Sequence, residues 1–305
     1  MRLYTHPDCL KHQMTPGHAE RPERLQALIA HLTQCGLMAD LDVHQPDEAS
    51  VDVLQKVHSA EHIDYIHAAS PDHGLIALDP DTAMCPGSLR AAKLAAGAVI
   101  CAVNAVLNAD TQRVFCAVRP PGHHAEAADA MGFCVFNSVA AGAAAALQHT
   151  TVDRVAVLDF DVHHGNGTVD IFKDTPEVLV CSSFQHPYYP NRQTDIQRPN
   201  IVNTPLASGT GSLDFRKAIE RDWIPAVRAH RPDLILISAG FDAHAEDPLA
   251  GLELHDDDFA WVTGLIVNLA DDFCDGRIVS ALEGGYDLHA LARSAEAHIR
   301  VLNES

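Results

Sequence analysis

Five short runs of apolar residues stand out along the chain, and each is followed closely by polar residues. The runs are continuous rather than alternating and contain many β-branched residues, which is typical of strands buried on both faces of a parallel sheet. They cover residues 114–118, 155–160, 178–183, 234–239 and 278–282. These runs therefore predict the core of a parallel β-sheet.

Longer stretches of helical character separate the apolar runs. The candidate helices span residues 88–108, 137–148, 214–229, 256–274 and 288–302. Alternating strands and helices predict an α/β fold with right-handed crossovers. No internal repeat or Pro/Ser-rich linker divides the chain, so we expect one domain over residues 1–305. The longest irregular stretches, 6–20 and 184–211, have the length of functional loops.

The composition is that of a globular protein, with 47% hydrophobic and 20% charged residues. No apolar run reaches the ~20 residues of a membrane helix, and the first residues lack the apolar core of a signal peptide. None of the eight Cys forms a C-x-x-C pair, which favours reduced, mostly buried thiols. These features predict a cytoplasmic protein with no membrane partner.

A formal net charge of −20 bears on the possible partners. Nucleic acids and anionic membranes repel an acidic surface, so the charge disfavours both. It is compatible with a cationic substrate, such as a lysine-rich or amine-bearing one, although acidity also serves solubility alone. The oligomeric state stays open.

A polar cluster follows four of the five predicted strands. The clusters occupy residues 119–126, 161–168, 240–249 and 283–287, and they carry His, Asp and Tyr. Ligands of parallel α/β sheets bind at the carboxyl ends of the strands, which meet at one edge. We therefore expect these clusters to converge on one site.

The segment Asp159-x-Asp161-x-His163 has a period of two, which places three side chains on the same face of a strand. Carboxylates and imidazole on one face suit a divalent metal ion. A buried Asp accepting backbone N–H bonds is the alternative, and the three neighbouring clusters favour the metal. The pair His123-His124 can divide acid and base roles if their pKa values differ.

Together these segments closely resemble the zinc-dependent histone deacetylase family, in particular its class II-like and bacterial members. The resemblance runs from about residue 5 to residue 295. It is carried by residues 17–25, 119–126, 131–137, 159–168, 238–244, 247–249 and 283–286.

The resemblance implies a three-layer arginase/deacetylase fold with a central, mainly parallel sheet of about eight strands. Residues 3–5 are then a further strand. It also implies an amidohydrolase whose single zinc ion is held by Asp161, His163 and Asp247. We hypothesise a bacterial enzyme.

The resemblance assigns roles to four further residues. His124 would act as general base and then general acid, while His123, tied to Asp159, would stabilise developing charge. Tyr286 would donate its hydroxyl to the oxyanion. Some relatives carry His at the Tyr286 position and act poorly on acetyl-lysine, so Tyr286 predicts a working deacetylase.

The resemblance also implies a substrate tunnel and a potassium site. The tunnel would be formed by Gly132, Phe133, Tyr189, Leu249 and Gly285. The potassium ion would be held by Asp159, Asp161, His163 and Ser182, although residues 182–185 depart from the usual family pattern.

The expected reaction is removal of acetyl or related acyl groups from acyl-lysine in a peptide or protein. Acetylpolyamines or other small acylated amines are the alternative substrates, and the apolar Leu249 disfavours polyamines because polyamine-selective relatives can carry an acidic residue there. A non-catalytic acyl-lysine binding protein is a second alternative. An arginase-like hydrolase with two manganese ions is a third, but residues 165–167 do not supply the second ligand set that it needs.

Overall fold

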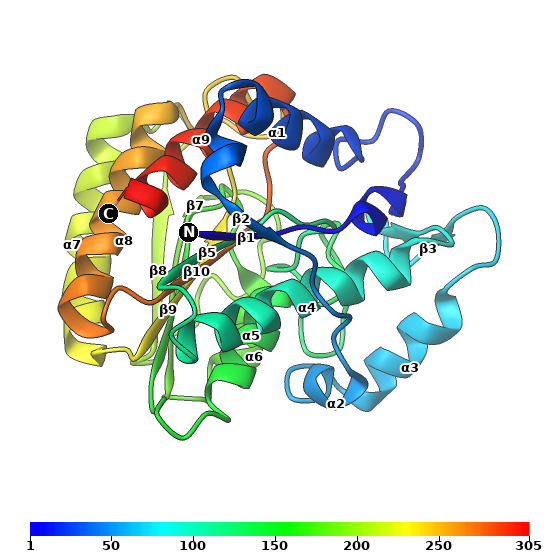
Figure 1. Cartoon of the computed structure of the whole chain (residues 1–305), viewed down its shortest axis with the longest axis horizontal. Coiled ribbons are helices and arrows are strands. Elements are labelled where there is room, and N and C mark those ends of the chain that lie inside the picture. Colours follow the sequence, from blue (N-terminus) through cyan, green and yellow to red (C-terminus); the bar gives the residue numbers. More distant parts are fainter. Residues whose placement is uncertain (305) are drawn as a thin grey trace.

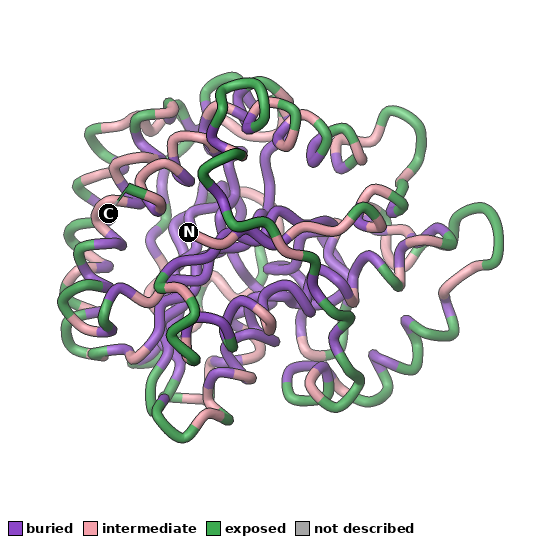
Figure 2. The backbone as a smooth tube through the Cα atoms, viewed as in Figure 1, coloured by how far each residue is buried: buried purple, intermediate pink, exposed green. Residues whose placement is uncertain are grey.

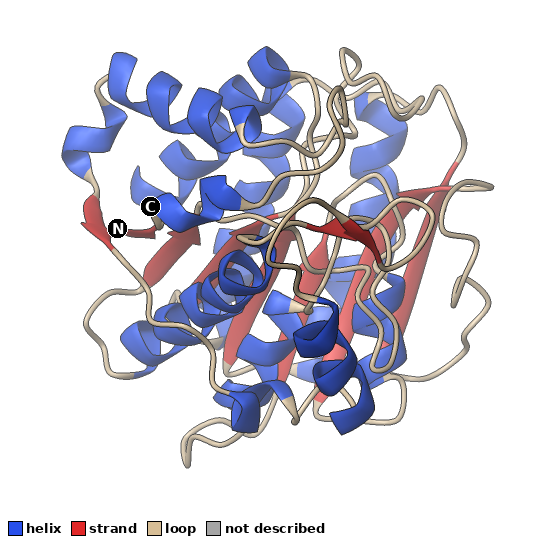
Figure 3. Ribbon diagram, turned by 90° about the vertical axis from the view of Figure 1, so that its right-hand side faces the viewer, coloured by secondary structure: helices blue, strands red, loops and turns tan. Residues whose placement is uncertain are grey.

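The computed structural model describes residues 1–304 and arranges them around one eight-stranded sheet. The strand order is β2-β1-β5-β10-β9-β6-β7-β8, and all the neighbouring strands pair in parallel (Figure 3). The bounds are β1 Arg2–Tyr4, β2 Asp42–His44, β5 Arg113–Cys116, β6 Val155–Asp159, β7 Val178–Gln185, β8 Ile201–Leu206, β9 Leu234–Ala239 and β10 Ile278–Leu282. The predicted fold class is therefore confirmed. Strands β3 Ile76–Ala77 and β4 Ala83–Met84 form a separate antiparallel pair.

The five strands predicted from apolar runs are β5, β6, β7, β9 and β10, and all their residues are buried. They occupy the middle of the sheet, where both faces are covered, so the continuous apolar pattern has a direct cause. Strand β1 confirms the expectation for residues 3–5 within one residue. The edge strands β2 and β8 were not predicted. Both are partly exposed, and Asn203 and Pro205 interrupt the apolar pattern of β8.

Helices cover both faces of the sheet (Figure 1). Helices α1, α7, α8 and α9 contact one another on one face, and α4, α5 and α6 do so on the other. The bounds are α1 Glu23–Gln34, α2 Val51–Leu54, α3 Ala60–Ala69, α4 Ser88–Leu107, α5 Ser138–Ala146, α6 Asn166–Phe172, α7 Ser212–His230, α8 Asp256–Phe273 and α9 Leu288–Glu304, with 3-10 turns at Pro7–Lys11 and Leu37–Asp40. The five predicted helices are confirmed as α4, α5, α7, α8 and α9.

Helix α4 is long and apolar enough to cross a membrane by length and composition. However, 67% of the relevant window is buried inside the protein. It packs against α5 and strands β5 and β10. The centre of the molecule is buried (Figure 2). We therefore interpret α4 as a core helix.

Candidate active site

The four polar clusters predicted to converge do so. They follow β5, β10, β9 and β6, which are consecutive neighbours in the sheet. Because the strands are parallel, their carboxyl ends share one edge. The side chains that this arrangement brings together are His123, His124, Asp161, His163, Asp242, Glu283 and Tyr286.

Three of these side chains form a compact group of potential metal ligands. One ligand atom each of Asp161, His163 and Asp242 lies within 4.8 Å of the others, and all three residues are buried. Nδ1 of His163 is 3.1 Å from Oδ1 of Asp161 and 3.2 Å from Oδ2 of Asp242. The other carboxylate oxygens accept backbone N–H bonds at 2.9 Å, from Gly284 to Asp161 and from Val162 to Asp242. The backbone thus orients both carboxylates.

The group fits a divalent cation. Oδ1 of Asp161 and Oδ2 of Asp242 both face Nδ1 of His163, so two buried carboxylates share one imidazole. Burial lowers the pKa of His163, but Asp161 and Asp242 raise it to about 10, which reflects an excess of negative charge. Two carboxylates and an imidazole are a typical ligand set for Zn²⁺ with open positions.

The sequence predicts Asp247 as the third ligand, and this assignment stays a prediction; the carboxylate that contacts His163 in the structure is that of Asp242. The carboxylate of Asp247 is oriented by backbone N–H groups. Its Oδ2 accepts from Tyr286 N at 2.7 Å and Asp287 N at 3.3 Å, and its Oδ1 accepts from Leu249 N at 3.0 Å. Both Asp residues lie in the polar segment after β9.

Two glycines make room for the carboxylates. A Cβ added at Gly240 would lie 2.0 Å from Oδ2 of Asp161, and one at Gly284 would lie 2.0 Å from Oδ2 of Asp242. These distances are far below van der Waals contact. Glycine is therefore required at both strand ends for the ligand group to assemble.

His123 is held as a charged partner. Its Nδ1 donates to Oδ2 of Asp159 at 2.9 Å, and its Nε2 lies 3.6 Å from Oδ1 of Asp161. Burial lowers the pKa of His123, but Asp161 and Asp159 together raise it well above its usual value. The predicted link between His123 and Asp159 is present in the structure.

His124 is held as a neutral imidazole, in contrast to the charged His123. Its Nδ1 is 2.7 Å from Oδ1 of Asn166, and the amide of Asn166 is oriented because its Nδ2 donates to Oε1 of Glu126 at 2.7 Å. An amide oxygen only accepts, so Nδ1 of His124 carries the proton and Nε2 is left as the acceptor. Burial, His123 and His163 lower the pKa of His124 well below its usual value. The imidazole is therefore neutral and basic at Nε2.

A narrow cavity of about 170 Å³ leads to these groups. It is lined by Asp81, His124, Gly132, Phe133, His163, Tyr188, Tyr189, Leu249 and Tyr286. Four of the predicted tunnel residues are thus at its wall. Gly285 does not line this cavity, and its carbonyl accepts from Nε of Arg24 at 2.6 Å. Sequence reasoning missed Asp81 and Tyr188; the neighbouring Tyr189 was the available signal for Tyr188.

Tyr286 stands at the wall of the cavity as a hydroxyl donor. Its ring meets Phe133 edge-on at 5.8 Å and lies 4.9 Å from the guanidinium of Arg24. Burial raises the pKa of Tyr286 well above its usual value, so the hydroxyl keeps its proton. Arg24 is in turn fixed by the backbone carbonyls of Gly285 and Glu283.

The residues predicted to hold potassium lie at or just after the end of β6 and, for Ser182, within β7. Asp159 pairs with Ser182 in the sheet register, and Oγ of Ser182 accepts from Gly165 N at 3.1 Å. Oδ1 of Asp159 accepts from Asp161 N at 3.1 Å. Potassium binding at these positions stays a prediction.

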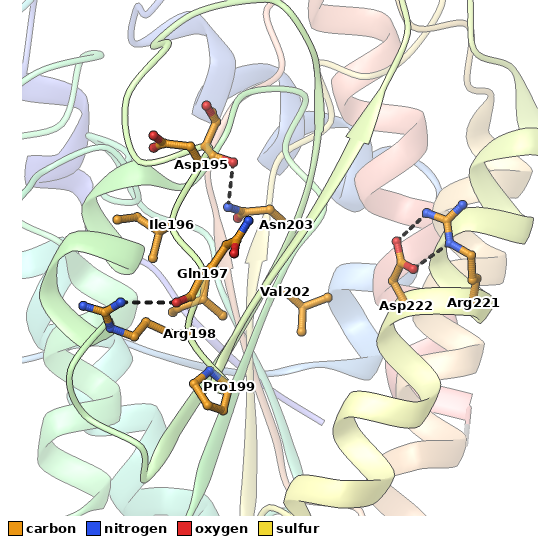
Figure 4. A pocket seen from close by; sticks show the side chains of 11 residues that line it. Asp195, Ile196, Gln197, Arg198, Pro199, Val202, Asn203, Arg221 and Asp222 are labelled. Carbon is orange, nitrogen blue, oxygen red and sulfur yellow. Dashed lines mark hydrogen bonds and ion pairs between the residues drawn. The ribbon is translucent and has the colours of Figure 1, made fainter.

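A larger cavity of about 820 Å³ is a surface groove between the segment 194–199 and helix α7 (Figure 4). Its wall carries Asn203 and the ion pair of Arg221 with Asp222, but no histidine. Oδ1 of Asn203 lies 2.9 Å from Nε2 of His164, the residue that follows His163. Size therefore does not mark the reactive cavity; the convergent titratable groups do.

Comparisons with known proteins agree with this site. The family model of the histone deacetylase domain matches residues 18–302. A histone deacetylase-like amidohydrolase of Pseudomonas aeruginosa is 39% identical over 277 residues, covering 88% of this chain and 73% of that protein. The mouse polyamine deacetylase HDAC10 is 36% identical over 323 residues, which cover 98% of this chain and 46% of that protein.

A solved structure, the crystal structure of the HDA15 HD domain, superposes with a TM-score of 0.94 at 33% identity, covering 100% of this chain and 88% of that one. The chain belongs to the histone deacetylase family. It is a hydrolase of amide bonds, of a family that acts on acylated lysine or polyamine substrates and is generally metal-dependent.

Proposed function

We propose that the chain removes acetyl or related acyl groups from the side-chain amine of acyl-lysine, with a zinc ion held by Asp161, His163 and Asp247. The observation that supports the proposal is the convergence of His163 with the neutral His124 and Tyr286 at one narrow cavity. A potassium ion held by Asp159, Asp161, His163 and Ser182 is part of the proposal.

When bound, zinc would polarise the amide carbonyl and lower the pKa of a water molecule. His124 accepts the proton of the attacking water at Nε2, because its Nδ1–H is committed to Asn166. The same nitrogen then delivers the proton to the leaving amine. His123 stays cationic beside Asp159 and stabilises the negative charge that develops.

Tyr286 donates its hydroxyl to the oxyanion of the tetrahedral species. A preorganised donor in that role is worth about 10²–10³ in kcat. The aromatic walls formed by Phe133 and Tyr189 exclude water from the reacting amide and leave room for an extended alkyl chain. This shape supports an acyl-lysine side chain as the group that enters.

Acetylated polyamines are the second candidate substrate. The carboxyl group of Asp81 lines the cavity and could face a cationic amine, and one relative is named a polyamine deacetylase. The apolar Leu249 on the same wall favours the acyl-lysine substrate instead.

The test is a panel of acetyl-lysine peptides, acetylpolyamines and small acetamides, assayed for kcat/KM with the zinc-loaded protein. We expect the peptides to exceed the polyamines by at least tenfold. If the acetylpolyamines instead have the higher kcat/KM, they replace acyl-lysine as the proposed substrate. If no compound releases acetate, a non-catalytic binding role replaces both.

A further inference from the structure

A second group of potential metal ligands lies outside the active site, where helix α1 ends against helix α9. It consists of His31, Cys35 and Glu296, and one ligand atom of each lies within 4.8 Å of the others. The two helices pack side by side (Figure 1). We propose that these three residues form a second zinc site, one that joins α1 to α9.

The placement of the ligands follows from helix geometry. His31 and Cys35 are four residues apart at the end of α1, so they lie one above the other on the same face. Glu296 comes from α9, the partner of that face, and its Oε2 lies 2.5 Å from Nε2 of His31. The three ligands therefore come from two rigid elements that are already packed together.

Glu296 is oriented as a single-oxygen ligand. Its Oε1 accepts from Nε of Arg300 at 2.8 Å, one helical turn along α9. This leaves Oε2 directed at His31. Partners that hold the far oxygen of a carboxylate are the usual outer support of metal ligands. Arg300 therefore orients Glu296 whether or not an ion is bound.

The donor set selects the class of metal. An imidazole nitrogen, a thiolate and a carboxylate suit Zn²⁺, whereas Mg²⁺ and Ca²⁺ take oxygen ligands. Cys35 is exposed, and His31 and Glu296 keep 29% and 20% of their side-chain surface accessible, so an ion can enter from solvent. Binding would replace the proton between His31 and Glu296 and release the thiol proton of Cys35.

The experiment uses the full chain and compares the wild type with Cys35→Ser. After equilibration with Zn²⁺, we expect the wild type to hold one zinc per chain more than the variant, counted by elemental analysis. The cobalt-loaded wild type should also show a sulfur-to-cobalt charge-transfer band that Cys35→Ser lacks. The ligands proposed for the active site contain no sulfur, so this band reports only the second site.

The matched control is Cys101→Ser, a partly buried cysteine elsewhere on the molecule, which should change neither reading. His31→Ala should lose the same equivalent of zinc as Cys35→Ser. An equal zinc count in wild type and Cys35→Ser, or a sulfur band that does not depend on Cys35, overturns the proposal. Neither measurement uses deacylation, so the second site and the proposed function fail separately.

Discussion

The amide oxygen of Asn166 lies 2.7 Å from Nδ1 of His124 and so decides which nitrogen of the imidazole carries the proton. The side-chain amide of Asn166 cannot flip freely, because its nitrogen donates a hydrogen bond to Glu126. A carboxylate at position 166 would also accept from Nδ1 but would add a negative charge. Asn therefore fixes the tautomer without stabilising the imidazolium.

Asn166→Asp is expected to raise the pKa of His124, because the imidazolium gains a charged partner. The base form is then populated only at higher pH, so the acid limb of kcat/KM against pH moves upward. The measurement is the pH–rate profile. Asn166→Leu is the companion variant, which removes the acceptor and should lower kcat without that upward shift. An unchanged acid limb in Asn166→Asp would contradict the assigned role.

Asp247→Asn and Asp242→Asn test which carboxylate is the third zinc ligand. Loss of a direct ligand in Asp247→Asn should weaken zinc binding by more than the 10–100-fold typical of outer partners. Asp242→Asn should weaken it less, because Asp242 contacts His163 and the backbone of Val162. Bound zinc after dialysis, measured beside kcat, distinguishes the two variants. Zinc loss confined to Asp242→Asn would contradict the assignment to Asp247.

Tyr286→Phe removes the hydroxyl and keeps the ring packed between Phe133 and Arg24. We expect kcat to fall about 10²–10³-fold with little change in KM, since the donor acts on the oxyanion and not on the bound amide. Steady-state kinetics with an acetyl-lysine peptide measure both constants. Equal kcat in variant and wild type would exclude the role.

The buried pair of Glu20 and Arg119 predicts how stability depends on pH. Arg119 donates to the two oxygens of Glu20 at 2.5 and 2.6 Å, with neither side chain exposed. Burial raises the pKa of Glu20, but Arg119 and His12 lower it well below the usual 4.5. The folded-state pKa is thus depressed, so this stabilisation is present above pH 4.5 and is lost as the pH falls toward the folded-state value.

Glu20→Gln should lower the free energy of unfolding at pH 7 by about 3–5 kcal/mol, because it leaves Arg119 buried without its charge partner. It should also flatten the loss of stability between pH 5 and pH 3. Urea unfolding at several pH values measures both effects. Glu220→Gln, on the exposed surface of α7, is the control and should change neither.

The sequence predicted the sheet best where burial is complete. Strands β6 and β9 are fully buried and mostly apolar, so their pattern is read directly, whereas β2 and β8 lie at the edges, are partly exposed and mix polar with apolar residues. Helix α1 was not predicted, although its buried face carries Leu25, Leu28 and Leu32 at helical spacing.

For the active site, the sequence predicted the residue types but not the contacts between them. His123 and His124 were recognised from their place after a strand, and the structure adds the Asn166 contact that makes them differ. The contact of Asp242 with His163, which the sequence did not predict, depends on the path of the loop after β9. That path is a tertiary property, so residue types and spacing do not contain it.

The proposed zinc ligands come from the ends of β6 and β9, two strands that are neighbours in the sheet but distant along the chain. A partly folded chain in which these strands have not yet paired has at most Asp161 and His163 in place, which is a poor chelator. Metal uptake must therefore follow sheet assembly. Bound metal then marks a chain that has finished folding, and nascent or misfolded copies have little capacity to withdraw zinc from other proteins.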